Sequence, residues 1–242
     1  MKYHVPVLAT LVTGGEQLGG TPFGLPAERW PICAECSRPQ SLIAQLWHDD
    51  RRLDLGASGR VLFVFQCEWD AGMCSNWELF SGANACLVLS ERELTGQASP
   101  PPDPVPPVVP AVGILGWQEK DDGLAAEVQP AFFDYDDYLA LADEEWEKAT
   151  GETRLGGVPH WVQSPDEAPK DGWRFMGQLD SMYRFADRSV PLPTTLRLAA
   201  DTGGDDPLFA EGPNFGGGFA YLFARDGEGD APPAVAMFWQ CS

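Results

Sequence analysis

A three-part pattern occurs twice in this sequence, and it restricts the possible folds more than any other feature. The first copy reads LGGTP at residues 18–22, then an apolar run around Gln45, then Gly59 followed by a dense aromatic and β-branched run. The second copy reads LGGVP at residues 155–159, then an apolar run around Gln178, then Gly218 followed by another aromatic run. One Gly-Gly-x-Pro element can arise by chance, but three elements in the same order predict an internal duplication.

The apolar runs have the composition of buried β-strands. Residues 41–47 carry apolar side chains on both faces of an extended chain, which is typical of a strand covered on both sides. Residues 60–66 are rich in β-branched and aromatic side chains, which favours a strand. We expect further strands at residues 5–12, 77–90, 173–180, 219–224 and 234–240. The predicted fold class is therefore α+β, predominantly β, with two related halves and few helices.

Seven prolines lie between residues 97 and 112 and separate the two copies. This density excludes a helix or a central strand, so the segment is expected to be an extended connector. A docking site for a proline-recognising module is the alternative, although basic flanking residues are missing. The predicted organisation is a first repeat at residues 1–96 with a cysteine-rich site, a proline-rich linker at residues 97–112 and a second repeat at residues 113–242. The two repeats are expected to form one globular unit, with a long loop at residues 187–217.

One helix is predicted, over residues 134–149. Tyr135, Tyr138, Leu139, Ala142 and Trp146 recur at helical spacing and predict a buried face. Asp134 is the expected N-cap, and Gly151 ends the helix. The acidic residues fall mostly on the other face, and they are Asp136, Asp137, Asp143, Glu144, Glu145 and Glu147. We take Asp143, Glu144 and Glu147 as candidate binding residues for a basic partner, and a merely solvated helix face is the alternative.

The charge balance restricts the possible partners. The chain has 16 basic and 36 acidic residues, a net charge of −20, of which −5 lies in residues 1–112 and −15 in the rest. This field repels phosphate backbones, so direct nucleic-acid binding is not expected, whereas a basic protein client is. The alternative is that acidity serves solubility alone. No stretch approaches about 20 apolar residues, so no membrane span is expected. The N-terminal apolar run lacks a convincing cleavage site, which favours a cytoplasmic protein.

Four cysteines form two pairs with metal-ligand spacing. Cys33 and Cys36 are separated by two residues, and Cys67 and Cys74 by six. A tight Cys-x-x-Cys turn can direct both sulfurs at one ion, so the four together predict a structural zinc site. The alternative is four reduced thiols that serve as small apolar residues. A thioredoxin-like redox role is disfavoured because no βαβ pattern surrounds the first pair. Cys86 and Cys241 lie in apolar strand runs and are expected to be buried free thiols.

Polar residues near the repeated motifs provide a second candidate site. Gln178 and Asp180 share a strand face, and with Gln45 they form a possible binding site between the halves. The favoured alternative is that both glutamines bind backbone groups of the Gly-Gly-x-Pro loops. The sequence has no nucleophile-elbow, zinc-protease or phosphate-loop motif. A non-enzyme is therefore expected, and the alternative is a hydrolase with a polar cleft between the halves.

With these motifs the chain resembles the superfamily that joins the programmed cell death protein 2 family to the bacterial YwqG-like proteins of unknown function. Residues 18–22, the four cysteines, Gln45 and residues 62–67 carry the first pattern, and residues 236–241 are similar to that family's terminal strand. Residues 155–159 and 176–181 resemble the YwqG-like pattern. The chain departs from the former family in having few cysteines after Cys74.

The resemblance implies a non-catalytic, duplicated α+β fold. It also implies a role as a dedicated chaperone or adaptor, as in the family members that serve a small-subunit ribosomal protein. The expected function is therefore a protein-binding adaptor or chaperone-like module for a basic, ribosomal-type client.

Overall fold

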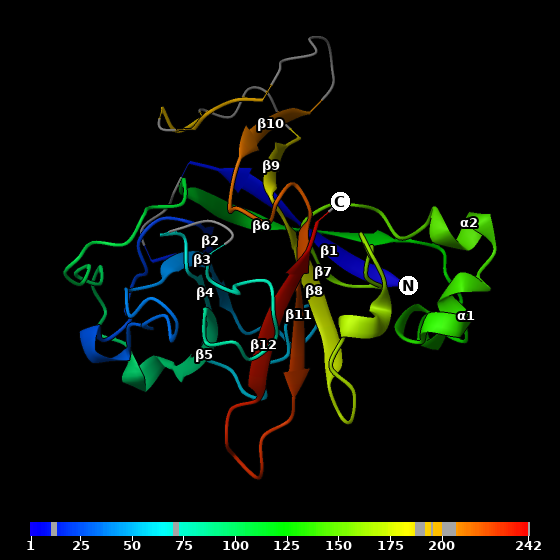
Figure 1. The fold of residues 1–242 in the computed structure, drawn as a ribbon, viewed down its shortest axis with the longest axis horizontal. Coiled ribbons are helices and arrows are strands. Elements are labelled where there is room, and N and C mark those ends of the chain that lie inside the picture. Colours follow the sequence, from blue (N-terminus) through cyan, green and yellow to red (C-terminus); the bar gives the residue numbers. More distant parts are fainter. Residues whose placement is uncertain (11–13, 70–72, 187–191, 195, 200–206, 242) are drawn as a thin grey trace.

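The computed structural model describes residues 1–10, 14–69, 73–186, 192–194, 196–199 and 207–241. Its main element is a ten-stranded sheet with the strand order β12-β11-β8-β7-β1-β6-β2-β3-β4-β5 (Figure 1). The strands of this sheet are β1 (Lys2–Ala9), β2 (Gln17–Leu18), β3 (Ser41–Trp47), β4 (Arg60–Gln66), β5 (Asn84–Ser90), β6 (Val112–Asp121), β7 (Arg154–Gly156), β8 (Arg174–Asp180), β11 (Phe219–Arg225) and β12 (Ala234–Gln240). The helices among the described residues are short, so the prediction of a predominantly β fold is confirmed.

The first strand of each half pairs with a strand of the other half. β1 lies between β6 and β7, and β6 lies between β1 and β2, all in antiparallel register. From this central pair the order runs β2-β3-β4-β5 on one side and β7-β8-β11-β12 on the other. The segments before and after the proline-rich linker are therefore intertwined in one sheet. The equal order on both sides agrees with a duplication, which stays a prediction.

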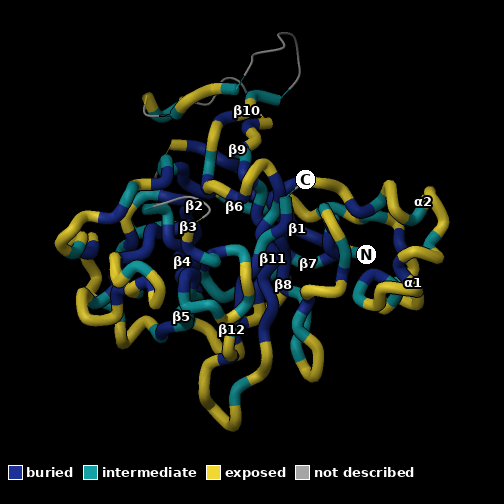
Figure 2. Tube along the Cα trace, in the orientation of Figure 1, coloured by how far each residue is buried: buried dark blue, intermediate teal, exposed yellow. Residues whose placement is uncertain are grey.

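The sheet curves until its two outermost strands approach each other. β5 and β12 are in contact, and the Trp239 backbone N–H donates to the Trp77 carbonyl oxygen at 3.2 Å. The inner face encloses a core to which both halves contribute, for example Leu62 of β4 and Leu222 of β11, each 0% exposed. Figure 2 shows the buried residues gathered along the strands at the centre and the exposed ones on the peripheral loops. One apolar core therefore serves both halves.

The outer faces of the same strands are covered separately. On β4, Phe63 and Phe65 point away from the shared core and pack with Trp30. On β11, Tyr221 and Phe223 do the same with Trp161. Fully burying a side chain of this size contributes about 1.5–3 kcal/mol, so the outer layers matter for stability. This arrangement explains why the strand sequences are apolar on both faces.

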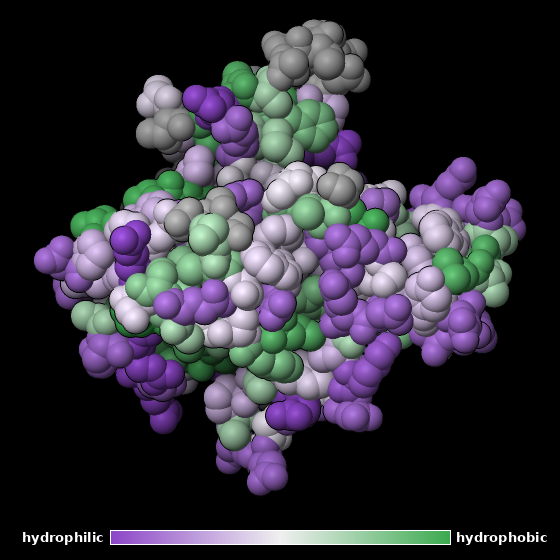
Figure 3. All heavy atoms as spheres, viewed as in Figure 1, coloured by the Kyte–Doolittle hydropathy of each residue, from purple (hydrophilic) through white to green (hydrophobic). Residues whose placement is uncertain are grey.

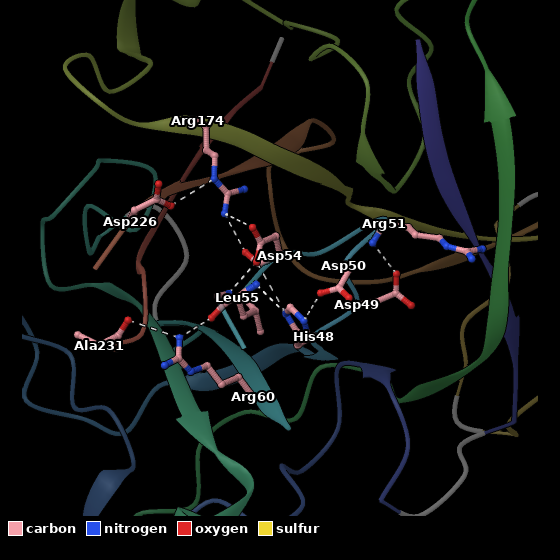
Figure 4. Close-up of polar contacts among 11 residues, drawn as sticks. His48, Asp49, Asp50, Arg51, Asp54, Leu55, Arg60, Arg174, Asp226 and Ala231 are labelled. Atoms are coloured by element: carbon pink, nitrogen blue, oxygen red, sulfur yellow. Dashed lines mark hydrogen bonds and ion pairs between the residues drawn. The ribbon is translucent and has the colours of Figure 1, made fainter. Parts of the chain in front are cut away.

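Two arginines, Arg60 and Arg174, connect the halves (Figure 4). Arg174 of β8 donates from Nη2 to the Asp54 carbonyl oxygen at 2.8 Å, and its guanidinium lies 3.7–3.8 Å from the carboxylates of Asp226 and Asp54. Arg60 of β4 donates to the Asp230 carbonyl oxygen in the β11–β12 hairpin. Each half thus sends one arginine to a loop of the other.

The prediction of one helix over residues 134–149 is wrong. The chain forms α1 (Tyr135–Leu139) and α2 (Asp143–Trp146) with a break between them. In a continuous helix, Tyr138 and Trp146 would lie about 12 Å apart along the axis. The break lets their rings stack at a centroid distance of 4.5 Å and lets Trp146 Nε1 donate to the Tyr138 carbonyl oxygen at 3.0 Å. Asp134 caps α1 as predicted, because its side chain accepts from the N–H groups of Asp136 and Asp137.

Because of the break, the predicted buried face of the helix does not form. Tyr138 is 7% exposed, but Tyr135, Leu139 and Trp146 are 44%, 56% and 40% exposed. Only one of the five predicted face residues is therefore buried. No helix among the described residues has the length and apolar character needed to cross a membrane.

Other boundaries differ from the prediction where pairing depends on distant strands. Within the loop expected at residues 187–217, residues 208–211 form β10 (Leu208–Glu211), which pairs with β9 (Met182–Phe185) in a separate two-stranded sheet. The parts of that loop at residues 187–191, 195 and 200–206 lie outside the described residues, as do residues 11–13 of the expected first strand. The strand expected at residues 77–90 begins only at Asn84, and β6 was not predicted.

Candidate functional site

The four predicted ligand cysteines come together at the end of β4. The sulfur atoms of Cys33, Cys36, Cys67 and Cys74 all lie within 4.8 Å of one another, and those of Cys36 and Cys67 are 3.6 Å apart. Four tetrahedral thiolates at about 2.3 Å from a zinc ion would place their sulfurs about 3.8 Å from each other. The cluster therefore has the donor set and the spacing of a closed four-coordinate metal site.

A tight turn presents the first pair of sulfurs. The Ser37 N–H donates to the Cys33 carbonyl oxygen at 2.9 Å, and the Cys33 N–H donates to the Arg38 carbonyl oxygen at 2.8 Å. The turn is held against the neighbouring loop because the Ala34 N–H donates to the Gly82 carbonyl oxygen at 3.0 Å. A Cβ at Gly82 would lie 2.7 Å from the Ala34 Cβ, so this approach requires glycine.

The second pair is fixed by the strand end and by a buried asparagine. The Cys67 N–H, directly after β4, donates to the Ala83 carbonyl oxygen at 2.8 Å. Asn76, which is 3% exposed, donates from Nδ2 to the Cys67 carbonyl oxygen at 2.8 Å and from its N–H to the Cys74 carbonyl oxygen at 2.7 Å. Asn76 therefore sets the distance between the two cysteines, although residues 70–72 between them lie outside the described part of the chain.

Burial and hydrogen bonding change the pKa values of Cys36, Cys67 and Cys74 in different directions. Burial raises the pKa of the Cys67 thiol well above its usual value and raises that of Cys74 to about 11. Burial also acts to raise the pKa of Cys36, but hydrogen bonds from the Arg38 backbone and the neighbouring thiols lower it on balance. Four thiolates cannot coexist in this space without a compensating positive charge, which a bound divalent cation supplies.

The four-cysteine cluster is close to the protein surface on one side. A depression of about 300 Å³ lies over it, lined in part by Cys36, Arg38, Trp69 and Met73. The Arg38 guanidinium lies 5.0 Å from the centre of the Trp69 ring, and Met73 is 71% exposed. Elsewhere, Cys86 and Cys241 are free thiols as predicted, but both are partly and not fully buried. Burial raises the pKa of the Cys86 thiol to about 12.

The two glutamines of the repeated pattern hold backbone groups. Gln45 Oε1 accepts from the Phe23 N–H at 2.9 Å, and Gln45 Nε2 donates to the Phe23 carbonyl oxygen at 3.1 Å. Gln178 Oε1 accepts from the His160 N–H at 2.8 Å, and Gln178 Nε2 donates to the Glu152 carbonyl oxygen at 3.0 Å. Phe23 and His160 each directly follow the proline of a Gly-Gly-x-Pro motif. The favoured alternative from the sequence is thereby confirmed.

The proposed binding role of Gln45 and Gln178 is wrong. Both side chains are 0% exposed, and both ends of each amide are bonded to backbone, so neither can contact a partner. Gln45 is not joined to Gln178 and Asp180 in a shared polar site. Asp180 ends β8, accepts from the Met182 N–H at 2.9 Å, and has a pKa raised to about 6 by burial.

The glycines of the two motifs have the same backbone conformation. Gly19 and Gly20 have φ values of 65° and 77°, and Gly156 and Gly157 have values of 80° and 69°. These are left-handed conformations that favour glycine. At Gly19 a Cβ would lie 2.2 Å from the Pro110 carbonyl oxygen, so the proline-rich linker itself packs against the first motif. Each motif is thus a compact loop, and a buried glutamine side chain forms hydrogen bonds with the backbone at the residue that follows it. We call this arrangement a glutamine clamp.

The three candidate acidic residues Asp143, Glu144 and Glu147 are all exposed at α2. They lie beside the exposed apolar residues of α1 and α2. In Figure 3 the end of the molecule that carries these helices shows hydrophilic atoms around a small hydrophobic patch. The surface is therefore both acidic and apolar.

Two acids with unusual surroundings were missed by the sequence analysis, the half-buried Glu68 and the buried Glu152. Burial raises the pKa of Glu68 to about 7, and its carboxylate accepts from Gln66 Nε2 at 2.9 Å. Glu152 is 5% exposed and pairs with two basic side chains. In a sequence with 36 acidic residues, no local pattern distinguishes these two.

Comparison of the chain with models of known protein families, with curated proteins and with solved structures gives no match. The resemblance to the programmed cell death protein 2 and YwqG-like superfamily therefore rests on the sequence motifs alone. Function has to be argued from the sites themselves.

The glutamine clamps give a first prediction. Gln45→Ala and Gln178→Ala should each lower the free energy of unfolding by about 2–4 kcal/mol, because each leaves buried backbone groups without hydrogen-bond partners. Gln97→Ala is the matched control, because Gln97 is exposed, and it should change stability by less than about 0.5 kcal/mol. Urea unfolding measures all three. If Gln45→Ala and Gln178→Ala both lowered the free energy of unfolding only as much as Gln97→Ala does, the structural role of the two glutamines would be contradicted.

Proposed function

We propose that this protein is a protein-binding adaptor or chaperone-like module for a basic client. The observation that carries the proposal is the mixed character of one surface, which we call the α1–α2 surface. It comprises Tyr135, Leu139, Asp143, Glu144, Trp146 and Glu147, all of them exposed.

The apolar part of the α1–α2 surface supports a protein partner. The break between the helices leaves three large apolar side chains 40–56% exposed within a dozen residues. Exposed apolar groups gathered among charged ones are typical of interaction sites, whereas single exposed apolar residues need no explanation. Aromatic residues in particular contribute much of the binding energy at protein interfaces.

The charged part supports a basic partner. Residues 134–147 contain seven acidic residues and no lysine or arginine, so their carboxylates have no basic neighbour within the segment. A basic amphipathic segment would satisfy both kinds of group, with its apolar side chains on Leu139 and Trp146 and its cations on the carboxylates. The net charge of −20 would guide such a segment toward the protein and would repel nucleic acid.

The alternative hydrolase has less support. Glu68 and Asp180 are the two carboxylic acids with clearly raised pKa values. Each accepts a hydrogen bond from a nearby backbone N–H group. Neither of these two acids lines the largely apolar pocket that lies between β1, β6 and β9. An enzyme of this kind would instead be expected to direct such groups into one cavity.

We further propose that the four-cysteine cluster binds zinc with a structural role. Four protein thiolates leave no open coordination position, which distinguishes structural from catalytic zinc sites. The ion would brace the Cys33–Cys36 turn against the end of β4, where the local apolar cluster contains little besides the cysteines and Ala83. Such a site needs reduced thiols, and the expected cytoplasmic location would keep them reduced.

Zinc binding predicts a defined metal content. Purified protein should contain one zinc per chain by elemental analysis, and X-ray absorption should give sulfur ligands at about 2.3 Å. Cys36→Ser should lower the zinc content well below one equivalent, whereas Cys241→Ser should leave it unchanged. Both cysteines are partly buried, so the two variants are matched. Zinc far below one equivalent in the parent protein, with all four thiols readily alkylated in the native state, would contradict the proposal.

The basic client predicts a salt-dependent association rate. The client is first captured from a lysate at low salt and identified by mass spectrometry. Asp143→Asn, Glu144→Gln and Glu147→Gln combined should then slow its association by at least about tenfold at low ionic strength, because long-range attraction acts mainly on encounter. The difference should fade at about 0.15 M salt, where the screening length is about 8 Å. Stopped-flow or surface-based kinetics measure both rates.

A second triple variant controls for net charge. Glu91→Gln, Asp103→Asn and Glu228→Gln remove the same charge from three exposed positions elsewhere. This control should slow association much less than the α2 variant. Equal effects of the two variants would mean that only the overall charge matters, and an unchanged rate for the α2 variant at low salt would exclude the α1–α2 surface.

A further inference from the structure

A pocket of about 420 Å³ lies where β9 approaches β1 and β6. Figure 1 shows the paired strands β9 and β10 rising from the main sheet at this point. The walls are largely apolar and include Val5 and Val7 of β1, Leu115 of β6 and Met182 of β9. Residues of both halves line the pocket. It therefore exists because β1 and β6 pair across the two halves at the centre of the sheet. None of the motifs discussed above explains it.

A β-bulge exposes the apolar wall of this pocket. Val7 is paired with Gly116 and Leu8 with Ile114, so Leu115 has no partner on β1. A bulge of this kind redirects a side chain and is common beside functional sites. Leu115 is 62% exposed and Val7 is 42% exposed, at the mouth of the pocket. The fold thus leaves two large aliphatic side chains open to solvent next to a cavity.

A buried carboxylate with two cations lies in the same pocket. The side chain of Glu152 is 6% exposed, and Glu152 Oε2 lies 3.1 Å from Lys120 Nζ and 3.0 Å from Arg184 Nη1. Lys120, Glu152 and Arg184 all line the cavity. The charged side chains that line the cavity thus have a net charge of +1, in a chain whose total charge is −20, and the Asp180 carboxylate interacts with Arg184 from outside the lining.

The two cations retain capacity for a further anion. A guanidinium has five N–H donors, and among the described residues Arg184 uses one of them, toward Glu152. The side chains of Arg184 and Lys120 are 44% and 33% exposed, so a ligand can reach them from the pocket. Their attraction to Glu152 also holds them in place before a ligand arrives, which reduces the entropy lost on binding.

We propose that this pocket binds a small amphiphilic monoanion, with an apolar chain and one carboxylate. The chain lies against Val5, Val7, Leu115 and Met182, and the carboxylate accepts hydrogen bonds from Arg184 and Lys120. A volume of about 420 Å³ falls in the usual range for small-molecule sites, which are mostly apolar with a few polar groups that fix orientation. A cationic ligand would be repelled by the two basic side chains. This site is independent of the adaptor function proposed above.

Calorimetric titration of the full chain with decanoate, below its micelle concentration at pH 8, tests the proposal. Decanoate should bind with 1:1 stoichiometry and at least about tenfold more tightly than decanol, because only the carboxylate forms ion pairs with Arg184 and Lys120. Decyltrimethylammonium should bind less tightly than either. Equal affinity for decanoate and decanol, tighter binding of the cation, or no binding of decanoate would each overturn the proposal.

Two pairs of variants locate the site. Arg184→Gln should reduce decanoate affinity to that of decanol without changing decanol binding, and Arg92→Gln, at an exposed arginine of the 3-10 helix Glu91–Glu93, should change neither. Leu115→Glu should weaken decanoate at least about tenfold, because it places a carboxylate in the apolar wall. Val108→Glu is its control, since Val108 is also exposed, at 63%. Decanoate binding that survives both Leu115→Glu and Arg184→Gln would assign the ligand to another place and overturn the proposal.

Discussion

The antiparallel pairing of β1 with β6 is the interaction on which the rest of the structure depends. Each of these strands belongs by sequence to one half and pairs on its other edge with the other half. Without β1, both β6 and β7 would expose unpaired edges, and the inner apolar face would lose its central strand. The shared core also contains residues of both halves, such as Leu62 and Leu222. The proline-rich linker is therefore a crossing between two parts of one sheet, and it does not separate independent domains.

This framework places three sites at different positions of one rigid sheet. The cysteine cluster lies at the end of β4, where a small apolar cluster gives little stability of its own. The α1–α2 surface lies at the end of the molecule away from β3, β4 and β5 (Figure 1). The pocket lies at the joint between the halves, next to the bulge at Leu115. Loops that carry function are usually positioned by such a scaffold, and here Gln45 and Gln178 fix the two Gly-Gly-x-Pro loops to it.

The sequence predicted those features that depend on neighbouring residues. Residues 41–47, 60–66 and 234–240 were predicted as strands with the bounds that the structure has, because their burial on both faces is visible in their composition. The cysteine pairs also converge as their spacing predicts. Features that depend on distant contacts were not predicted. They are the pairing of β6 with β1, the stacking of Tyr138 on Trp146 across the break between α1 and α2, and the contacts of Glu152 with Lys120 and Arg184.

Native-state hydrogen exchange of the full chain tests most directly whether the two halves form one cooperative unit. The centres of β4 and β11 lie in different halves, and side chains of both strands, such as Leu62 and Leu222, face the same core. If the halves are intertwined, both sets of backbone amides at these centres should exchange with the same free energy, equal to that of global unfolding measured with denaturant. Exchange of one set at a free energy lower by more than about 2 kcal/mol would show that its half opens alone, and would contradict a shared core.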